Sequence, residues 1–463
     1  MNKPADKPPV KFAHTPAMPF NPDVNNYFSR GGMAGTMLPY QLSGWQNETR
    51  SWKQTCYLHT MLSGRGKGAI LKGPDAEKLL SHGFVNDFRL ERFPVGAARH
   101  IISCVPNGNI GCDGVCLRTA PDTFVTYTRE PFISMYAASG KFDVEPFVAE
   151  ETRATIFQLG GPRSLEIVEN LIGEDIHDLR FMRFRAAKIL GLDVQVLRMG
   201  MAGTLSYEIH VNNLDHVMEL YDEVVRVGER FGLIVLGRLA YMSNHTENGF
   251  PQQGYHFIPD WSDPAIQAYM GKDGSVDGGD FRKVPLRGSM QGEGRQAYHL
   301  NPFEAGWGHS INWDHDFVGK KALEKIKQDP RTRKVVTLEW DYRDILKVFE
   351  TYFDDDPAVA REMQIPQNLL ENPAGNFQDK VLGENGEMIG KSTGRVYTIH
   401  YKKMISMGFI DPECAEIGRE VVVIWGEPGT RQIPIRARVA RYPYLDLTPN
   451  AKYDIQSIPH YGK

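Results

Sequence analysis

Three side chains stand out by type and position: Tyr241, Glu208 and Arg129. A tyrosine has a pKa of about 10, so it is protonated at pH 7 and can donate to a leaving oxygen of similar basicity. A carboxylate accepts two N–H groups at once, and a planar guanidinium matches a carboxylate. Each residue also has an ordinary explanation: a core tyrosine, a glutamate at a strand edge, an ion pair on the surface. The residues alone leave both interpretations open.

The elements that must position these side chains follow from periodicity. Around Glu208, residues 205–211 alternate between apolar and polar types, which predicts a strand with one wet or functional face. The apolar spacing of residues 214–231 predicts a helix, which Asn212 or Asn213 can cap, with Gly232 in the left-handed conformation beyond its end.

A strand, a Gly-Pro turn and a helix recur twice, at residues 69–82 and 156–172. The recurrence indicates either two related α+β lobes or a chance repetition of a common turn. From about residue 333, strands at 335–338, 420–425 and 433–439 predict a C-terminal antiparallel β domain. The sequence therefore predicts a mobile N-terminal arm 1–25, two interleaved α+β lobes 26–332, and a C-terminal β domain 333–463 with an insertion 341–376.

The composition of the chain excludes several classes of function. With 463 residues, 53 basic and 57 acidic residues and a net charge of -4, it has no electrostatic reason to bind nucleic acid or an anionic membrane. No stretch is apolar for the ~18 residues of a membrane helix. The odd count of five cysteines favours a reducing, cytoplasmic location. Cys104, Cys112 and Cys116 form no C-x-x-C pair, so buried thiols are predicted there rather than a metal site.

Four segments, in order along the chain, resemble the glycine-cleavage T-protein (aminomethyltransferase) superfamily. They are residues 106–113 (PNGNIGCD), 198–209 (RMGMAGTLSYEI), 301–308 (NPFEAGWG) and 316–323 (DFVGKKAL). The resemblance runs from about Trp45 to Tyr444. It implies an α+β fold of the three-domain cloverleaf type, in which two α+β lobes and a C-terminal antiparallel β-barrel-like domain surround a folate cavity.

Within this superfamily the chain resembles the tetrahydrofolate-dependent aryl O-demethylases of the vanillate and syringate type. Residues 237–244 (GRLAYMSN) are similar to their G-x-R-A-Y-x-S-N segment. The resemblance implies that Tyr241 is catalytic, that Arg129 holds a substrate carboxylate, that Glu208 hydrogen-bonds the pterin ring and that Phe250 lies near the folate. The implied reaction moves the methyl group of a methoxylated aromatic acid to N5 of tetrahydrofolate without a metal, and it gives a phenol and 5-methyltetrahydrofolate.

Two departures from the family pattern bear on the substrate. Cys112 stands where the T-protein has the first of two aspartates, and only Asp113 remains, which argues against aminomethyl chemistry. Vanillate demethylases carry a His-His pair where residues 61–65 here read MLSGR. In those relatives a histidine of the pair contacts the ring phenol, so its absence favours a dicamba-like 2-methoxybenzoate over a vanillate- or syringate-like substrate.

Two other functions remain open at this point. One is folate-dependent one-carbon transfer from an amine or a sulfonium donor; a sulfonium is already a good leaving group and would not need Tyr241. The other is a non-catalytic folate-binding module.

Overall fold

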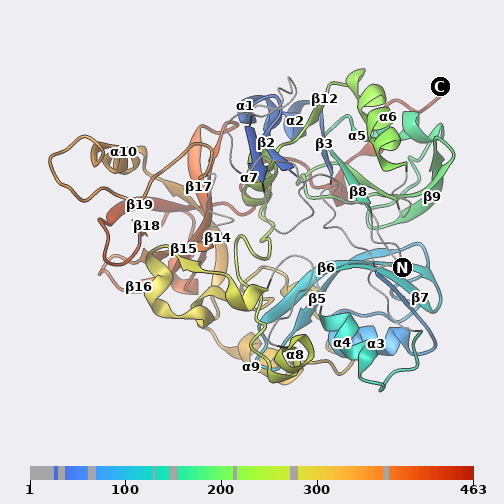
Figure 1. Cartoon of the computed structure of the whole chain (residues 1–463), viewed down its shortest axis with the longest axis horizontal. Coiled ribbons are helices and arrows are strands. Elements are labelled where there is room, and N and C mark those ends of the chain that lie inside the picture. Colours follow the sequence, from blue (N-terminus) through green and yellow to red (C-terminus); the bar gives the residue numbers. More distant parts are fainter. Residues whose placement is uncertain are drawn as a thin grey trace, which may run out of the picture.

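The structure is a computed structural model that describes residues 26–29, 37–60, 69–128, 131–145, 155–211, 216–271, 280–368 and 375–462. Arg129, the segment 61–65 and the predicted arm 1–25 lie outside these residues. Three sheet-based parts surround a short central helix, α7 (Arg238–Asn248), as Figure 1 shows. The three-domain cloverleaf fold is therefore confirmed.

The first lobe is a four-stranded antiparallel sheet in the order β4-β7-β6-β5, with helices on one face (Figure 1). Its elements are β4 (Ala69–Lys72), α3 (Ala76–Gly83), β5 (Ala98–Cys104), β6 (Ile110–Ala120), β7 (Thr123–Thr128), α4 (Phe132–Ala138) and α8 (Pro264–Met270). Helix α9 (Lys320–Gln328) packs against it through Leu323. The predicted strand and helix at residues 69–82 are confirmed, and Leu79 and Leu80 face the core as expected.

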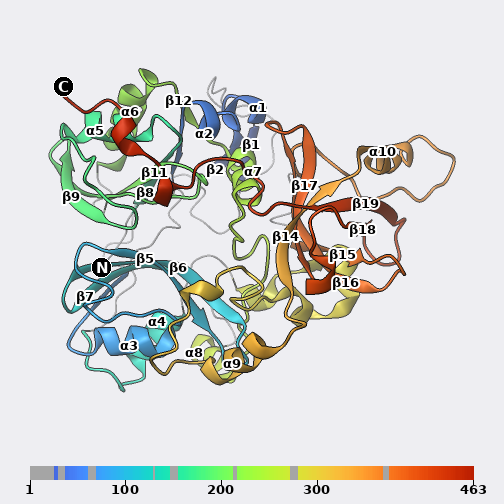
Figure 2. The ribbon, with the colours of Figure 1, turned by 180° about the vertical axis from the view of Figure 1, so that it is seen from behind.

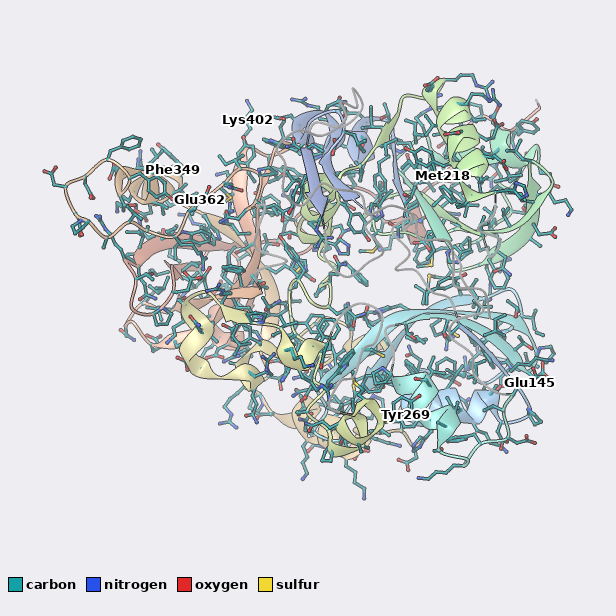
Figure 3. The ribbon with its side chains drawn as sticks, in the orientation of Figure 1. Glu145, Met218, Tyr269, Phe349, Glu362 and Lys402 are labelled. Atoms are coloured by element: carbon teal, nitrogen blue, oxygen red, sulfur yellow. The ribbon has the colours of Figure 1, made fainter. Side chains whose placement is uncertain are left out.

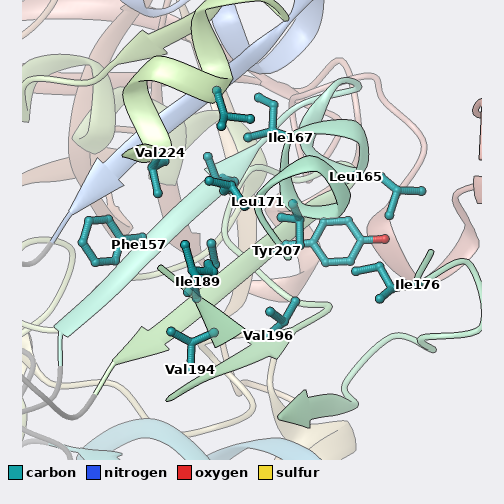
Figure 4. Close-up of a cluster of buried hydrophobic side chains, with 14 of the residues drawn as sticks. Phe157, Leu165, Ile167, Leu171, Ile176, Ile189, Val194, Val196, Tyr207 and Val224 are labelled. Carbon is teal, nitrogen blue, oxygen red and sulfur yellow. The ribbon is translucent and has the colours of Figure 1, made fainter. Parts of the chain in front are cut away.

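The second lobe is a six-stranded sheet in the order β12-β3-β8-β11-β10-β9, in which only β12 runs parallel to its neighbour. Its elements are β3 (Cys56–Thr60), β8 (Thr155–Gly160), α5 (Ser164–Ile172), β9 (Phe184–Ile189), β10 (Leu192–Leu197), β11 (Ser206–Val211), α6 (Val217–Glu229) and β12 (Leu233–Val235). Figure 4 shows the apolar core between this sheet and its helices, where Phe157, Tyr207 and Val224 meet.

The C-terminal part is an antiparallel barrel of six strands, closed by a pairing between β15 and β18. Its strands are β14 (Lys334–Trp340), β15 (Asn376–Leu382), β16 (Met388–Thr398), β17 (Lys403–Ile410), β18 (Glu420–Trp425) and β19 (Ile433–Ala440). A seventh strand, β13 (Leu286–Arg287), pairs with β15 from upstream of residue 333. The predicted boundary at 333 therefore stays a prediction, although β14 begins next to it.

The predicted insertion 341–376 begins as helix α10 (Tyr342–Glu350). Asp341 caps this helix because its carboxylate accepts the backbone N–H groups of Arg343 and Asp344. Residues 369–374 of the insertion lie outside the described residues. Phe349 on α10, Tyr269 on α8 and Met218 on α6, labelled in Figure 3, mark the outer sides of the three parts.

The last residues of the chain cross from the barrel back to the second lobe, as the red segment in Figure 2 shows. Arg198 fixes this return, since its guanidinium donates to the carbonyl oxygens of Asn450 and Tyr453. Near the N-terminus lie β1 (Asn26–Ser29), β2 (Met37–Gln41), α1 (Trp45–Glu48) and α2 (Ser51–Gln54). Among the described helices, none has both the length and the apolar character that a bilayer span requires.

Three local predictions concern the start of α6, Gly232 and the cysteines. Helix α6 begins at Val217 with His216 as its N-cap, whereas the predicted caps, Asn212 and Asn213, lie outside the described residues. Gly232 does take the expected left-handed conformation, with φ 73°. The three neighbouring cysteines are buried thiols, as predicted.

Candidate functional site

A row of polar side chains crosses three neighbouring strands of the second lobe. The strand register places His59 of β3 opposite Gln158 of β8, and Gln158 opposite Glu208 of β11. Residues directly opposite each other project from the same face of a sheet. Gln158 Nε2 donates to Glu208 Oε1 over 2.9 Å, and both side chains are buried.

Strand alternation explains why these polar groups face away from the helices. On β11, Tyr207 and Ile209 belong to the apolar core next to α5 (Figure 4). Ser206, Glu208 and His210 therefore point to the opposite face, and all three are buried. The predicted polar face is thus not wet, which leaves the functional interpretation.

His210 extends the row toward the first lobe. Its Nε2 lies 2.8 Å from Glu208 Oε2, so Nε2 carries the hydrogen because a carboxylate can only accept. The ring of Tyr127, from β7 of the first lobe, meets the His210 ring edge to face at 4.5 Å. The two lobes therefore meet beside Glu208.

Helix α7 brings Tyr241 to this row. The Tyr241 ring stacks on His59 at 3.6 Å between centroids and 4° between planes, and its edge meets His245 at 4.9 Å. Its hydroxyl donates to Met201 Sδ over 3.7 Å, a weak acceptor that a better one can replace. Gly237 permits the close approach of the helix, since a Cβ there would lie 2.2 Å from the carbonyl oxygen of Tyr40.

Burial sets the protonation states around Tyr241. Burial and the charge of Glu208 raise the pKa of Tyr241, while Arg238 opposes them, so the hydroxyl keeps its proton at neutral pH. Burial lowers the pKa of His59 and that of His245 to about 3 each. Both histidines are therefore neutral, and each offers one ring nitrogen as an acceptor.

Phe250 lies where the three parts of the molecule meet. Its ring centroid is 6.1 Å from His245 of α7, 5.3 Å from His100 of the first lobe and 5.4 Å from Trp307. His100 Nε2 in turn contacts Asp113 Oδ2 at 3.0 Å. An aromatic surface thus continues from the Tyr241 side toward Asp113.

Several buried polar atoms around these residues have no hydrogen-bond partner within the described part of the chain. They are His59 Nδ1, Gln158 Oε1, His210 Nδ1, Asp113 Oδ1 and His245 Nε2. Buried polar atoms are nearly always hydrogen-bonded in native proteins, so these atoms point to a ligand. A pterin ring, which carries both N–H donors and acceptors on one edge, fits this mixed set.

The structure brings together three of the four predicted site residues. Gln158 and His59 connect Glu208 to Tyr241, and His245 connects Tyr241 to Phe250. Arg129 lies outside the described residues. Sequence reasoning missed His59, Gln158 and His210.

Comparison with known proteins identifies the family. The chain is 36% identical to the sesamin methylene transferase of Sinomonas sp. (strain No.22) over 91% of this chain and 93% of that protein. The chain belongs to the aminomethyltransferase (GCVT) family. Residues 38–263 match the family model of the GCVT N-terminal domain.

Two further relatives support this assignment. The syringate O-demethylase of Sphingobium sp. (strain NBRC 103272 / SYK-6) is 32% identical over 88% of this chain and 90% of its own length. The aminomethyltransferase T of Bartonella henselae shares the fold, with a TM-score of 0.63 and 16% identity over 91% of this chain and 94% of that chain. The chain is accordingly a folate-dependent one-carbon transferase of this family.

Proposed function

We propose that the protein is a tetrahydrofolate-dependent aryl O-demethylase that moves the methyl group of a methoxybenzoate to N5 of tetrahydrofolate. The observation that carries this proposal is the protonated Tyr241, stacked on His59 beside the buried row of Gln158 and Glu208. A buried phenol is an unusual proton donor, and it matches a leaving phenolate in basicity.

The main task of the protein in this reaction is to protonate the leaving oxygen. An aryl methyl ether is inert because phenolate is a poor leaving group. Tyr241 donates its proton as the methyl C–O bond breaks, and it regains a proton from solvent afterwards. Bound tetrahydrofolate supplies the neutral amine that takes the carbon, and the proton lost from that amine balances the one gained by the phenol.

Glu208 and Phe250 would hold the folate. The two oxygens of Glu208 each accept one bond, from Gln158 and His210, and a carboxylate oxygen can accept a second. Glu208 can therefore orient pterin N–H groups while its own position stays fixed. Phe250 offers an aromatic surface at the meeting point of the lobes.

The substrate proposal combines two residues. Arg129 would hold the carboxylate of the aromatic acid through its planar fork. We favour a dicamba-like 2-methoxybenzoate, because its product phenol hydrogen-bonds to the adjacent carboxylate. Because the neutral His59 beside Tyr241 could accept a hydrogen bond from a ring hydroxyl, a vanillate- or syringate-like acid is the next candidate.

A second candidate reaction is methylene transfer. Here the donor is a CH2 group that bridges two ether oxygens on an aromatic ring. The relative named as a sesamin methylene transferase favours it. The two reactions give different folates, 5-methyl- or 5,10-methylenetetrahydrofolate. A sulfonium donor differs from both because it is already a good leaving group, so replacing Tyr241 by Phe would then cost little.

The test is incubation with tetrahydrofolate and a panel of 2-methoxybenzoate, vanillate, syringate and neutral anisoles, with the folate product identified by mass. Methyl transfer from the benzoates supports the proposal, whereas methylene transfer replaces it with the second candidate. Turnover of vanillate far faster than that of any 2-methoxybenzoate rejects the dicamba-like choice.

The Arg129→Ala variant should raise KM steeply for benzoates but little for neutral anisoles, and equal loss on both excludes its carboxylate role. Folate binding without any transfer indicates a non-catalytic module.

A further inference from the structure

Arg238, the first residue of α7, lies at the edge of the polar row. Strand β12 runs parallel beside β3, with Val235 opposite Leu58, and the chain turns at Gly237 into the helix. The start of α7 therefore emerges next to the end of β3, where His59 lies. Arg238 and Tyr241 are three residues apart, so their side chains share one face of the helix.

Among the residues that the structure describes, none forms a hydrogen bond or an ion pair with the guanidinium of Arg238, whose side chain is half-buried. Other buried arginines are paired: Arg118 with Glu77, and Arg198 with Asn450. Glu48, which reaches the same helix end, is engaged by the backbone N–H groups of Gly237, Leu42 and Ser43. Since a half-buried charge without a partner has lost part of its hydration, its position needs an explanation.

Tyr241 is placed between charges of opposite sign. Glu208 raises the pKa of Tyr241, and Arg238 lowers it. Tyrosines 40 and 255 and the neutral histidines 59 and 245 also interact electrostatically with Arg238. Among the described residues, Arg238 is therefore a fixed cation that a negative charge developing near the Tyr241 hydroxyl would meet.

We propose that Arg238 stabilises the negative charge on the departing aryl oxygen and on Tyr241 during methyl transfer. This inference rests on the proposed demethylation. As the C–O bond breaks, its electron pair stays on the aryl oxygen, which takes the proton of Tyr241 and leaves the charge shared between the two oxygens. A preorganised guanidinium that pairs with no described carboxylate stabilises that charge more than it stabilises the neutral ground state, which is the condition for lowering a barrier.

The variants that test this role are Arg238→Gln and Arg238→Lys, with Arg226→Gln as the matched control. Arg226 is exposed on α6 and pairs with Glu223, away from the polar row. Arg238→Gln should lower the single-turnover rate about 100-fold, Arg238→Lys should recover part of the loss, and the control should leave the rate unchanged.

A purely structural role predicts that Arg238→Gln slows all substrates by the same factor. The rate is therefore measured over methoxybenzoates and anisoles whose phenol products differ in acidity. The slope of rate against phenol pKa should be steeper in Arg238→Gln.

A second readout needs no methyl transfer and separates this inference from the proposed function. The product phenol is titrated by absorbance while bound to wild type and to each variant. Wild type should ionise the bound phenol at a pH at least one unit lower than Arg238→Gln does. Equal ionisation and equal slopes overturn the inference while demethylation stands. A loss confined to carboxylate substrates also overturns it, because Arg238 would then hold the carboxylate. A wild type that shifts the phenol but transfers no methyl group refutes the proposed function and leaves the charge-stabilising site.

Discussion

The two faces of the six-stranded sheet carry opposite kinds of residue, although both are buried. On one face, Tyr207 and Ile209 of β11 pack into an apolar core against α5. On the other, Glu208 and His210 from the same strand join a polar row with Gln158. Apolar burial stabilises the fold, whereas buried polar groups with unpartnered atoms do so poorly. The difference indicates that the second face can receive a ligand, and the variants below should separate the two faces.

The largest effect is expected from Tyr241→Phe, which removes the hydroxyl oxygen next to the polar row of the six-stranded sheet. The proton donor is lost while the ring still stacks on His59, so kcat should fall about 100- to 10,000-fold. Thermal unfolding should change little, since the hydroxyl makes only weak interactions, a long bond to the thioether of Met201 and a contact with the side chain of Gln158. Single-turnover kinetics with tetrahydrofolate measure the effect. A loss below threefold would show that the leaving group needs no proton.

Ile209→Ala tests the apolar face one residue away from Glu208. Deleting a fully buried aliphatic side chain should lower the free energy of unfolding by about 2–5 kcal/mol. Chemical denaturation measures this loss. Activity per folded molecule should remain at the wild-type level, and a selective loss of kcat would mean that the two faces are not independent.

Glu208→Gln should give the reverse pattern. Hydrogen bonds to a charged group contribute about 1.5–3 kcal/mol, so KM for tetrahydrofolate should rise about 10- to 100-fold. The free energy of unfolding should stay the same or increase, because a buried carboxylate becomes a neutral amide. Steady-state kinetics and denaturation on the same preparation check both values. An unchanged KM together with a large loss of stability would assign Glu208 to the core instead.

The last prediction concerns the pH dependence of stability. His245 has a folded pKa of about 3 and an ordinary pKa of 6.5, so the unfolded chain binds more protons between these values. The free energy of unfolding should therefore fall as pH drops from about 6.5 toward 3, by ~1.4 kcal/mol per pH unit for this group. His245→Gln should flatten that slope in denaturation curves between pH 4 and 6.5. An unchanged slope would show that His245 is not buried as a neutral ring.

Much of the fold was predictable because it depends on local periodicity. The alternation around Glu208 predicted β11, and the strand and helix at residues 69–82 also follow local patterns. Of the residues that the structure brings together at the site, the sequence predicted only those that match family motifs, namely Tyr241, Glu208 and Phe250. The roles of His59 and Gln158 depend on strand register across β3, β8 and β11, which no single segment encodes. A polar residue inside a predicted strand was the available signal for Gln158, whereas the strand that carries His59 was not predicted.

The His-His comparison shows what spacing along the sequence leaves out. The segment 61–65 lacks the pair, and the sequence therefore predicted that the ring oxygen has no histidine partner. His59, two residues earlier, stacks on Tyr241 and offers a neutral ring there. Whether a histidine side chain reaches the site depends on which face of the sheet it projects from. The position of the residue in the sequence does not by itself settle this.

The most direct test of the central claim follows the methyl group itself. Wild-type protein is incubated with tetrahydrofolate and a 2-methoxybenzoate whose methyl carbon carries deuterium, and the folate is analysed by mass. The account predicts 5-methyltetrahydrofolate with all three deuterons and one equivalent of phenol. Phenol without labelled folate, or a folate that retains only two deuterons, would contradict it.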